Sequence, residues 1–262
     1  MARPKGADIL PQVIIACGYR QPYRKVFPAR PVVPQISLEM SLSQTLLELS
    51  RRHMAALSPR ERADIEDELD RLRMMRVAED GLAAGDPLPD FSLEDGAGRV
   101  WTSGELLDRG PLVLALFRGG WCPYCELTML ALEDARPAIE ALGATAVGVM
   151  PGGREVVASA AAKRAIRYPL LADPANGFAR MCGLTYELSL AYIRIHTDRG
   201  RDFRILHGEP VWQLPVPAVF VVEPSARVAW AFSDVDPSRW PDPQELLASL
   251  EALRNAHALS NR

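Results

Sequence analysis

The sequence predicts an α/β fold in which a central mixed sheet is flanked by helices and preceded by an N-terminal helical extension. Short apolar runs alternate with segments of helical periodicity between residues 112 and 182, and this alternation is typical of βαβ units with parallel strands. Two later apolar runs, 214–222 and 227–233, are separated by a short turn and predict an antiparallel pair. The chain has 262 residues, 48% of them hydrophobic, which is enough for one α/β core with additional segments.

Residues 1–39 show no sustained apolar period, and we interpret them as a disordered or artefactual extension, with Met40 as a natural start. The apolar stretch 9–17, behind two basic residues, loosely resembles an export signal. Asp8 and Pro11 interrupt it, however, and it is too short for a convincing signal sequence. We therefore expect a cytoplasmic protein.

Residues 40–82 form an N-terminal segment with helical periodicity. A second helix begins within it at a clear start signal: Ser58 can cap a helix, Pro59 suits the first helical position, and Glu61 completes a capping box. Gly81 ends the pattern. We expect two helices packed on the main domain. An alternative role for them is to bind a partner or to form a homodimer.

The main domain is expected over residues 83–256. Its first hairpin has strands at 91–93 and 100–102. The βαβ part places strands at 112–117, 144–150 and 168–172, and helices at 122–142, 154–166 and 175–182. Residues 183–213 are interpreted as an insertion with a helix from about Tyr186 and a charged loop. After the second hairpin, a closing helix runs from Asp242 and Pro243 to about residue 256.

The stretch that carries chemistry is 118–125, Arg-Gly-Gly-Trp-Cys-Pro-Tyr-Cys. Cys122 falls where the apolar strand ends and the helix begins, so free backbone N–H groups and the helix dipole favour its thiolate. Pro123 suits the first helical turn. Cys125 lies one turn further on the same helix face, within reach of a disulfide. Cys122 can therefore attack a disulfide or a peroxide, and Cys125 can resolve the product.

The neighbours of the two cysteines are candidates for supporting roles. Trp121 is expected to shield the pair on one side, and Tyr124 separates Pro123 from the second cysteine. Arg118 either adds positive charge to the site or points into water. The nearest acid is Glu126, a candidate proton acceptor. Cys182 is interpreted as a small core residue.

Two other interpretations of the cysteines stay open at this point. A structural zinc site needs four ligands, whereas only one Cys-x-x-Cys pair is visible and the other cysteines and the four histidines are scattered. The pair can also be inert and buried. Dithiol chemistry itself needs no metal or organic cofactor. A net charge of −3 gives no case for nucleic acid as a partner, and no apolar run is long enough to span a membrane.

Val216 and Pro217 form a second candidate element of the site. A proline at the head of a buried strand is unusual unless its geometry is used. We predict a cis bond between the two residues, which would direct the Val216 carbonyl or amide toward the dithiol. The alternative is a trans proline at the edge of the sheet.

Three segments together resemble a known family. They are Gly-Asp-x-x-Pro-Asp-Phe-Ser-Leu from Gly85, Leu-Ala-Leu-Phe followed by the dithiol motif from Leu114, and Leu-Pro-Val-Pro-Ala-Val-Phe-Val-Val from Leu214. They are similar to the peroxiredoxin-like branch of the alkyl hydroperoxide reductase / thiol-specific antioxidant family, which has the thioredoxin-like fold. The resemblance covers about residues 40–256.

The resemblance implies an antioxidant oxidoreductase that reduces hydroperoxides or disulfides through a redox-active disulfide. It implies that Cys122 attacks, that Cys125 resolves and that Pro217 is the cis proline. An external thiol donor of the thioredoxin, glutaredoxin or glutathione type would regenerate the dithiol.

Three positions depart from the typical pattern of peroxiredoxins. Typical members have a Thr or Ser three residues before the attacking cysteine and a Pro seven before it, whereas this chain has Gly119 and Ala115. Pro217 occupies the place of an arginine at the head of the penultimate core strand. With these residues the site resembles that of thioredoxin and glutaredoxin. Two rival functions therefore stay open: a general disulfide reductase, and a redox-sensing interaction protein whose helices at 40–80 bind a partner.

Overall fold

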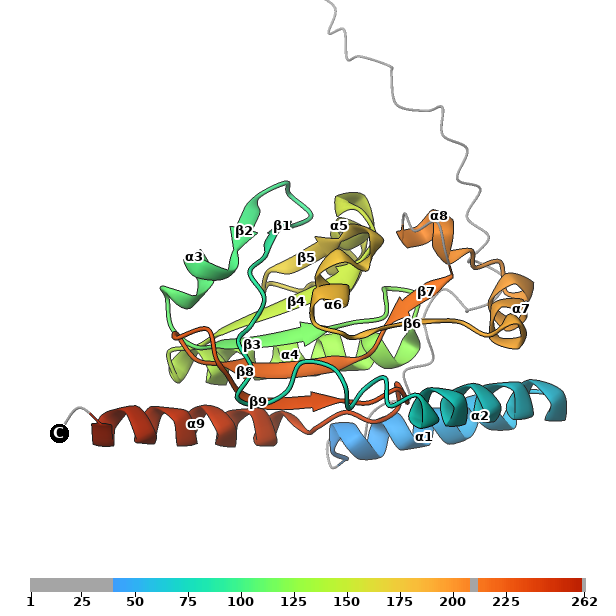
Figure 1. Ribbon diagram of the computed structural model, residues 1–262, viewed down its shortest axis with the longest axis horizontal. Helices are drawn as coiled ribbons and strands as arrows, with labels where there is room; N and C mark the ends of the chain where they lie inside the picture. Colours follow the sequence, from blue (N-terminus) through green and yellow to red (C-terminus); the bar gives the residue numbers. More distant parts are fainter. Residues whose placement is uncertain (1–39, 208–211, 261–262) are drawn as a thin grey trace, which may run out of the picture. The chain divides into compact units, whose positions relative to one another are not determined.

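The computed structural model describes residues 40–207 and 212–260, so the extension predicted at 1–39 lies outside the described residues. A five-stranded sheet with the order β5-β4-β3-β8-β9 forms the centre (Figure 1). Its strands are β3 (Leu112–Leu116), β4 (Thr145–Pro151), β5 (Leu170–Asp173), β8 (Ala218–Val222) and β9 (Val228–Ser233). The first three are parallel, while β8 is antiparallel to both β3 and β9. The prediction of a mixed sheet flanked by helices is confirmed.

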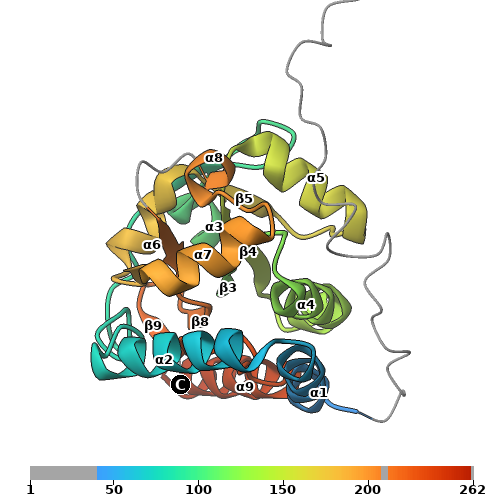
Figure 2. The same ribbon diagram turned by 90° about the vertical axis from the view of Figure 1, so that its right-hand side faces the viewer.

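Helices α4 (Pro123–Ala141) and α5 (Arg154–Arg164) connect the parallel strands. Both crossovers step in the same direction along the sheet, so their right-handedness places both helices on the same face. Helix α9 (Pro243–Ser260) packs beside α4 and against β8 and β9 (Figure 2). Strands β3 and β8 are buried along their whole length, because a strand at the centre of a covered sheet has no solvent face.

Smaller elements complete the main domain. A hairpin of β1 (Ser92–Glu94) and β2 (Val100–Thr102) precedes α3 (Ser103–Leu107), and a single 3₁₀ turn, η2 (Pro174–Asn176), leads into α6 (Gly177–Met181). No helix in the described part of the chain is long and apolar enough to cross a membrane.

Strand β8 is buried along its whole length, and Phe220 is its largest side chain, with no exposed surface. We expect Phe220→Ala to lower the free energy of unfolding by about 3–5 kcal/mol, because it removes buried apolar surface and leaves a cavity. Urea titration followed by circular dichroism measures this. Leu190→Ala is the control: Leu190 is 85% exposed, so its loss should change the free energy by less than about 0.5 kcal/mol. Equal effects of the two substitutions would contradict this assignment of the core.

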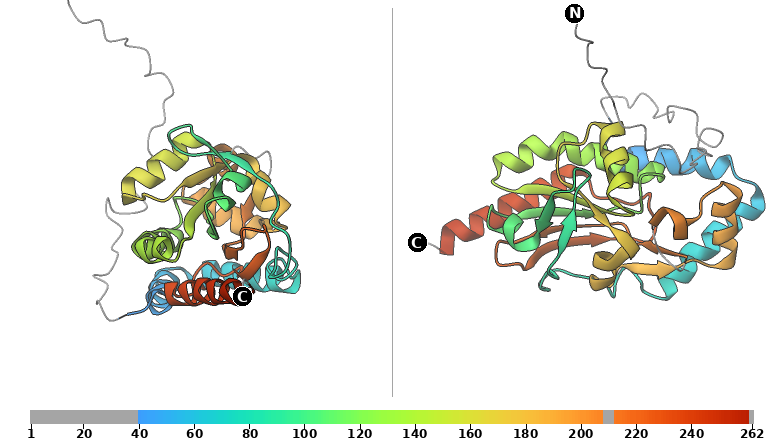
Figure 3. Two further views of the ribbon diagram at one scale, coloured as in Figure 1. Left: turned by 90° about the vertical axis from the view of Figure 1, so that its left-hand side faces the viewer. Right: turned by 90° about the horizontal axis from the view of Figure 1, so that it is seen from above.

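Two N-terminal helices, α1 (Leu42–Ala55) and α2 (Pro59–Met74), precede this domain. The capping box predicted at Ser58 and Glu61 is confirmed. Helix α1 packs against α4 (Figure 3). The carboxylate of Asp242, predicted to start the closing helix, accepts hydrogen bonds from the backbone N–H and the hydroxyl of Ser43, both at 3.0 Å. These bonds tie the beginning of α1 to the beginning of α9.

The insertion contains β6 (Thr185–Glu187), α7 (Leu190–Asp198), α8 (Phe203–His207) and β7 (Gln213–Pro215), with β6 and β7 paired antiparallel. The helix predicted from Tyr186 begins only at Leu190. The reason is local: the hydroxyl of Ser189 caps the helix by accepting the Tyr192 N–H, and the residues before it pair with β7. Helices α7 and α8 and the two N-terminal helices gather at the end of the sheet where α4 begins (Figures 1 and 2).

Candidate active site

Cys122 is the N-cap residue of α4, just beyond the end of β3. Its backbone N–H donates to the Gly119 carbonyl at 3.1 Å, and its carbonyl accepts the Glu126 N–H at 3.0 Å. Pro123 takes the first helical position. Cys122 and Cys125 are free thiols, only 2% and 3% exposed. The dithiol thus lies at the strand-to-helix junction that the sequence indicates.

Gly119 is required by the backbone of the loop that leads to Cys122. Its φ of +136° belongs to a region that residues with a side chain rarely adopt. A Cβ at this position would lie 2.6 Å from Nε1 of Trp121, which is closer than two such atoms can approach. A threonine therefore does not fit here, and this explains the departure from the typical peroxiredoxin pattern.

We expect Gly119→Thr to lower the free energy of unfolding by at least about 2 kcal/mol, because it adds backbone strain and displaces Trp121. Thermal unfolding, with Trp fluorescence as the probe, measures the change. Gly104→Ala is the matched control. Gly104 is helical and a Cβ there meets nothing within 4 Å, so this substitution should leave stability unchanged or raise it slightly. If Gly119→Thr is as stable as the control, the loop is not constrained as described.

The two thiols have opposite pKa shifts. Burial acts to raise the pKa of Cys122, but the hydrogen bond from the Cys125 thiol, the charge of Arg118 and the N–H groups of Cys125 and Tyr124 outweigh it and lower the pKa to about 6. Burial and the neighbouring Cys122 raise the pKa of Cys125 well above its ordinary value. At neutral pH the pair therefore consists of a nucleophilic thiolate at Cys122 and a thiol at Cys125.

Arg118 points into the site. Its side chain is 3% exposed, so the alternative that it points into water is wrong. One guanidinium N–H donates to the Tyr192 hydroxyl of α7 at 3.0 Å, and the backbone N–H of Arg118 donates to Sγ of Cys125 at 3.3 Å. One residue therefore contacts the Cys125 sulfur through its backbone, and the positive charge of its side chain acts to lower the pKa of Cys122.

Trp121 packs against the insertion. Its Nε1–H donates to Nε2 of His207 at 3.3 Å, and its ring lies 4.7 Å from that of Phe203 and 5.2 Å from that of His196. The guanidinium of Arg118 lies 5.3 Å from the same indole ring. The indole thus joins the dithiol loop to α7 and α8.

Three histidines that are distant in the sequence meet around the motif. Nδ1 of His53, on α1, is hydrogen-bonded to the Tyr124 hydroxyl at 3.1 Å, while His196 and His207 contact Trp121. Burial, followed by the charges of nearby arginines, lowers the pKa of each, to about 3 for His207. All three are neutral at pH 7, so the positive charge at the thiolate comes from arginine.

The three histidines lie far apart in the sequence, so their positions alone do not predict that they meet. A signal was present in the insertion: Tyr192 and His196 are four residues apart, as are Phe203 and His207. In a helix, this spacing places an aromatic ring and an imidazole on one face. The face is the one that covers Trp121.

The predicted cis bond between Val216 and Pro217 is wrong, because the described residues contain no cis peptide bond. The predicted single strand is instead divided here into β7 and β8. The Val216 N–H donates to the Leu184 carbonyl at 2.9 Å, and the Pro217 carbonyl accepts the Asp234 N–H at 3.2 Å. Both backbone groups therefore already have hydrogen-bond partners, and the peptide bond between Val216 and Pro217, which is trans, lies between β7 and β8.

The remaining candidate groups are engaged elsewhere. Glu126 pairs with Arg164 at 3.3 Å, and Arg164 also donates to the Gly120 carbonyl at 2.9 Å. Burial raises the pKa of Cys182 to about 12, so it stays a thiol in the core. In the described part of the chain, no group of three or more His, Cys, Asp or Glu side chains is placed to hold a metal ion.

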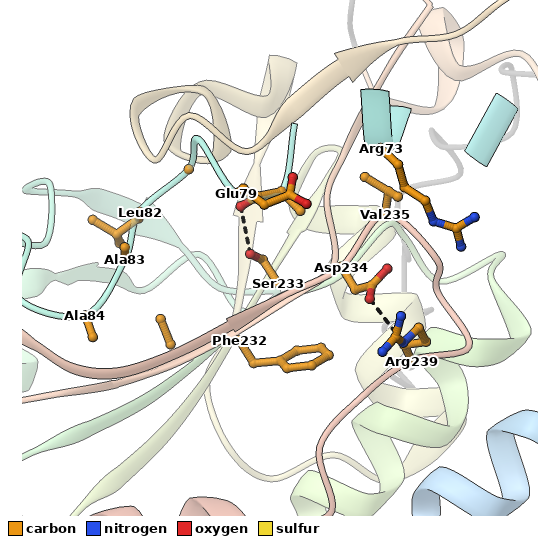
Figure 4. A pocket seen from close by; sticks show the side chains of 13 residues that line it. Arg73, Glu79, Leu82, Ala83, Ala84, Phe232, Ser233, Asp234, Val235 and Arg239 are labelled. Atoms are coloured by element: carbon orange, nitrogen blue, oxygen red, sulfur yellow. Dashed lines mark hydrogen bonds and ion pairs between the residues drawn. The ribbon is translucent and has the colours of Figure 1, made fainter. Parts of the chain in front are cut away.

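A pocket between the end of β9 and the segment after α2 is lined by neither cysteine (Figure 4). Two of its polar side chains are paired with their neighbours. Asp234 forms an ion pair with Arg239 at 3.2 Å, and the Ser233 hydroxyl donates to the Ala78 carbonyl at 3.0 Å. We therefore place the candidate active site at the dithiol.

Comparison with known proteins agrees with this site. The family model described as AhpC/TSA family matches residues 84–231, which is more than half of the chain and includes both cysteines. The chain belongs to the AhpC/TSA family. This membership confirms the resemblance that the sequence predicts. The protein is therefore a thiol-dependent peroxidase, which is a class of oxidoreductase. No curated protein matches the sequence.

Solved structures support the thioredoxin-like fold of this AhpC/TSA family member. Peroxidoxin BcpB from Mycobacterium tuberculosis is 23% identical, with a TM-score of 0.52 over 65% of this chain and 97% of that one. AhpC from Enterococcus faecalis is 17% identical, with a TM-score of 0.53 over 69% and 98%. A mutant of PrxQ from Xylella fastidiosa is 19% identical, with a TM-score of 0.51 over 65% and 96%.

Proposed function

We propose that this peroxidase reduces hydroperoxides with Cys122 as the attacking thiolate and Cys125 as the resolving thiol. The carrying observation is the pair's opposite protonation: the pKa of Cys122 is lowered to about 6 while that of Cys125 is raised. The thiolate attacks the terminal oxygen of the hydroperoxide, the O–O bond breaks, the alkoxide leaves and takes up a proton, and Cys122 becomes a sulfenic acid. The Cys125 thiol, one helical turn away, displaces water and forms the disulfide.

The other residues of the motif support this chemistry in defined ways. Arg118 supplies a positive charge where the thiolate forms and where negative charge develops on the leaving oxygen. Trp121 and Tyr124 connect the dithiol loop to α8 and α1 through His207 and His53. We propose that an external thiol donor of the thioredoxin, glutaredoxin or glutathione type regenerates the dithiol. We also propose that the protein is cytoplasmic.

Two assays run in parallel test the proposal. One measures the steady-state oxidation of a thiol donor that depends on hydroperoxide, and the other measures the reduction of insulin disulfides. We expect turnover with hydrogen peroxide and with an organic hydroperoxide, and a disulfide between the two cysteines after one equivalent of oxidant. Insulin reduction without peroxide turnover would overturn the proposal in favour of a disulfide reductase. Stoichiometric oxidation without turnover would overturn it in favour of a redox sensor.

A further inference from the structure

The two thiols of the candidate active site are buried, although they must react with molecules from outside the protein. Cys122 is 2% exposed and Cys125 is 3% exposed. Disulfide exchange requires a sulfur atom of the thiol donor to come into bonding contact with one of these two sulfur atoms. A molecule the size of hydrogen peroxide can pass between side chains that move by small amounts, whereas a protein cannot. Access for a protein donor therefore requires a part of the structure to move.

The part that packs on the dithiol loop is the segment 189–207, which contains α7 and α8 and which we call the cover. It lies at the end of the sheet where β3 ends (Figures 1 and 2). Two hydrogen bonds join it to the loop: the Tyr192 hydroxyl accepts one from Arg118 at 3.0 Å, and Nε2 of His207 accepts one from Trp121 at 3.3 Å. Displacing the cover therefore exposes the loop that carries the dithiol.

The cover is also attached to α2 of the N-terminal segment. Arg199 forms an ion pair with Glu61 at 2.7 Å, and Arg194 forms one with Asp64 at 3.0 Å. Both acids lie on α2, while Arg194 lies on α7 and Arg199 directly follows it. All four side chains are partly exposed, and an ion pair of this kind stabilises a contact only modestly. The attachment is therefore one that can break and form again while the rest of the fold stays intact.

The closed position of the cover leaves buried polar atoms without partners. His196, on α7, is 4% exposed, and neither of its ring nitrogens has a hydrogen-bond partner among the described residues. Nδ1 of His207, which is 2% exposed, also has none among them. A buried polar group without a partner is costly, and hydration in an open position removes this cost. The open and closed positions are therefore closer in free energy than the packing of the aromatic rings alone implies.

We propose that the cover selects the reactants of the dithiol by size and that α2 holds it closed. Small hydroperoxides and small thiols reach the cysteines while the cover is closed. A protein thiol donor reaches them only after the cover has moved away, so the ion pairs from α2 determine how often such a donor can react. This inference rests on the proposed function for the identity of the reactants, and it gives the N-terminal helices a role in specificity.

Two thiol reagents of different size measure access to the dithiol. The small one is methyl methanethiosulfonate, and the large one is a maleimide attached to a long polyethylene glycol chain. Each is added to the reduced full-length chain, and mass spectrometry follows modification of the peptide that carries Cys122 and Cys125. Arg194→Asp removes an ion pair and brings two carboxylates together at Asp64. We expect it to speed the large reagent about three- to tenfold and the small reagent by less than about twofold.

Three further variants separate the cover from general loosening of the fold. Asp64→Arg combined with Arg194→Asp reverses the ion pair and should return the rate of the large reagent to within about twofold of wild type. Asp70→Asn is the matched control: Asp70 also lies on α2 but pairs with Arg73 of the same helix at 2.9 Å, so both rates should stay within about twofold of wild type. His196→Leu removes the unpartnered nitrogens from the closed position and should slow the large reagent about fivefold or more, whereas damage to the fold would speed it.

Amide hydrogen exchange tests the same opening in the wild-type chain. The amides of α7 should exchange together and faster than those of β3, because the cover opens while the sheet stays folded. Amides of α7 that exchange as slowly as those of β3 would overturn the proposal. An Arg194→Asp variant that leaves the rate of the large reagent unchanged, or that speeds both reagents equally, would also overturn it.

Regeneration of the oxidised protein connects the cover to the reaction. Reduced thioredoxin, used as a protein donor, should regenerate Arg194→Asp about three- to tenfold faster than wild type, while dithiothreitol should regenerate both at similar rates. Equal effects on the two donors would refute selection by size. Hydroperoxide turnover is measured separately: its absence in the wild-type protein would refute the proposed function, and the reagent and exchange measurements would still decide on the cover.

Discussion

Replacing Cys122 with serine is expected to abolish hydroperoxide reduction, with a loss of about a thousandfold or more. A serine hydroxyl does not ionise at neutral pH, so the nucleophile disappears although Cys125 and Arg118 stay in place. The measurement is the rate of hydroperoxide consumption with a thiol donor at saturating concentration. Circular dichroism must show a folded variant, because Cys122 is buried.

Cys125→Ser is the matched control for this substitution. It leaves the thiolate in place, so the first attack on the peroxide should still occur, and a sulfenic acid on Cys122 should accumulate that dimedone traps. The intramolecular disulfide should be absent. If Cys122→Ser keeps its turnover while Cys125→Ser loses the first attack, the roles of the two cysteines are reversed.

The elements that the sequence predicts well are those fixed by local patterns. The apolar run that becomes β3, the capping box at Ser58 and Glu61, and the start of α4 at Pro123 all rest on residues a few positions apart. The strand β6 was missed because its pairing partner, β7, lies beyond two helices in the sequence. Val216 and Pro217 show the same limit, since the bonds to Leu184 and Asp234 that hold them come from other elements.

The candidate site likewise has features that local sequence patterns predict and features that depend on distant residues. The dithiol is visible from its spacing and from its place between a strand and a helix. The direction of Arg118 is not, because it depends on the Tyr192 hydroxyl, which the insertion brings from 74 positions away. The insertion that had no assigned role from the sequence thus supplies the hydrogen-bond acceptor for Arg118 and the rings that cover Trp121.

The second large expected effect is the pH dependence of the reactivity of the Cys122 thiol. With its pKa lowered to about 6, Cys122 is about nine-tenths thiolate at pH 7, whereas a thiol with a pKa near 9 would be about one-hundredth thiolate. A thiolate of lower pKa is intrinsically less nucleophilic, which offsets part of this gain, so we expect the alkylation of Cys122 by iodoacetamide to be about three- to sixfold faster at pH 7 than that of an unperturbed cysteine equally accessible to the reagent. The rate should rise about tenfold per pH unit below pH 6 and level off above it.

The lowered pKa of Cys122 also makes the free energy of unfolding depend on pH, and the direction of this dependence follows from the direction of the shift. Because the pKa of Cys122 is depressed in the folded state, ionisation contributes stability that is complete above the unfolded pKa, near 9, and is lost as pH falls through about 6. The difference in free energy of unfolding between wild type and Cys122→Ser should therefore shrink as pH falls from 9 to 6. Urea titrations of both proteins across this range measure it. A constant difference, together with an alkylation rate still rising above pH 8, would show that Cys122 is not ionised at neutral pH, and the mechanism would lose its nucleophile.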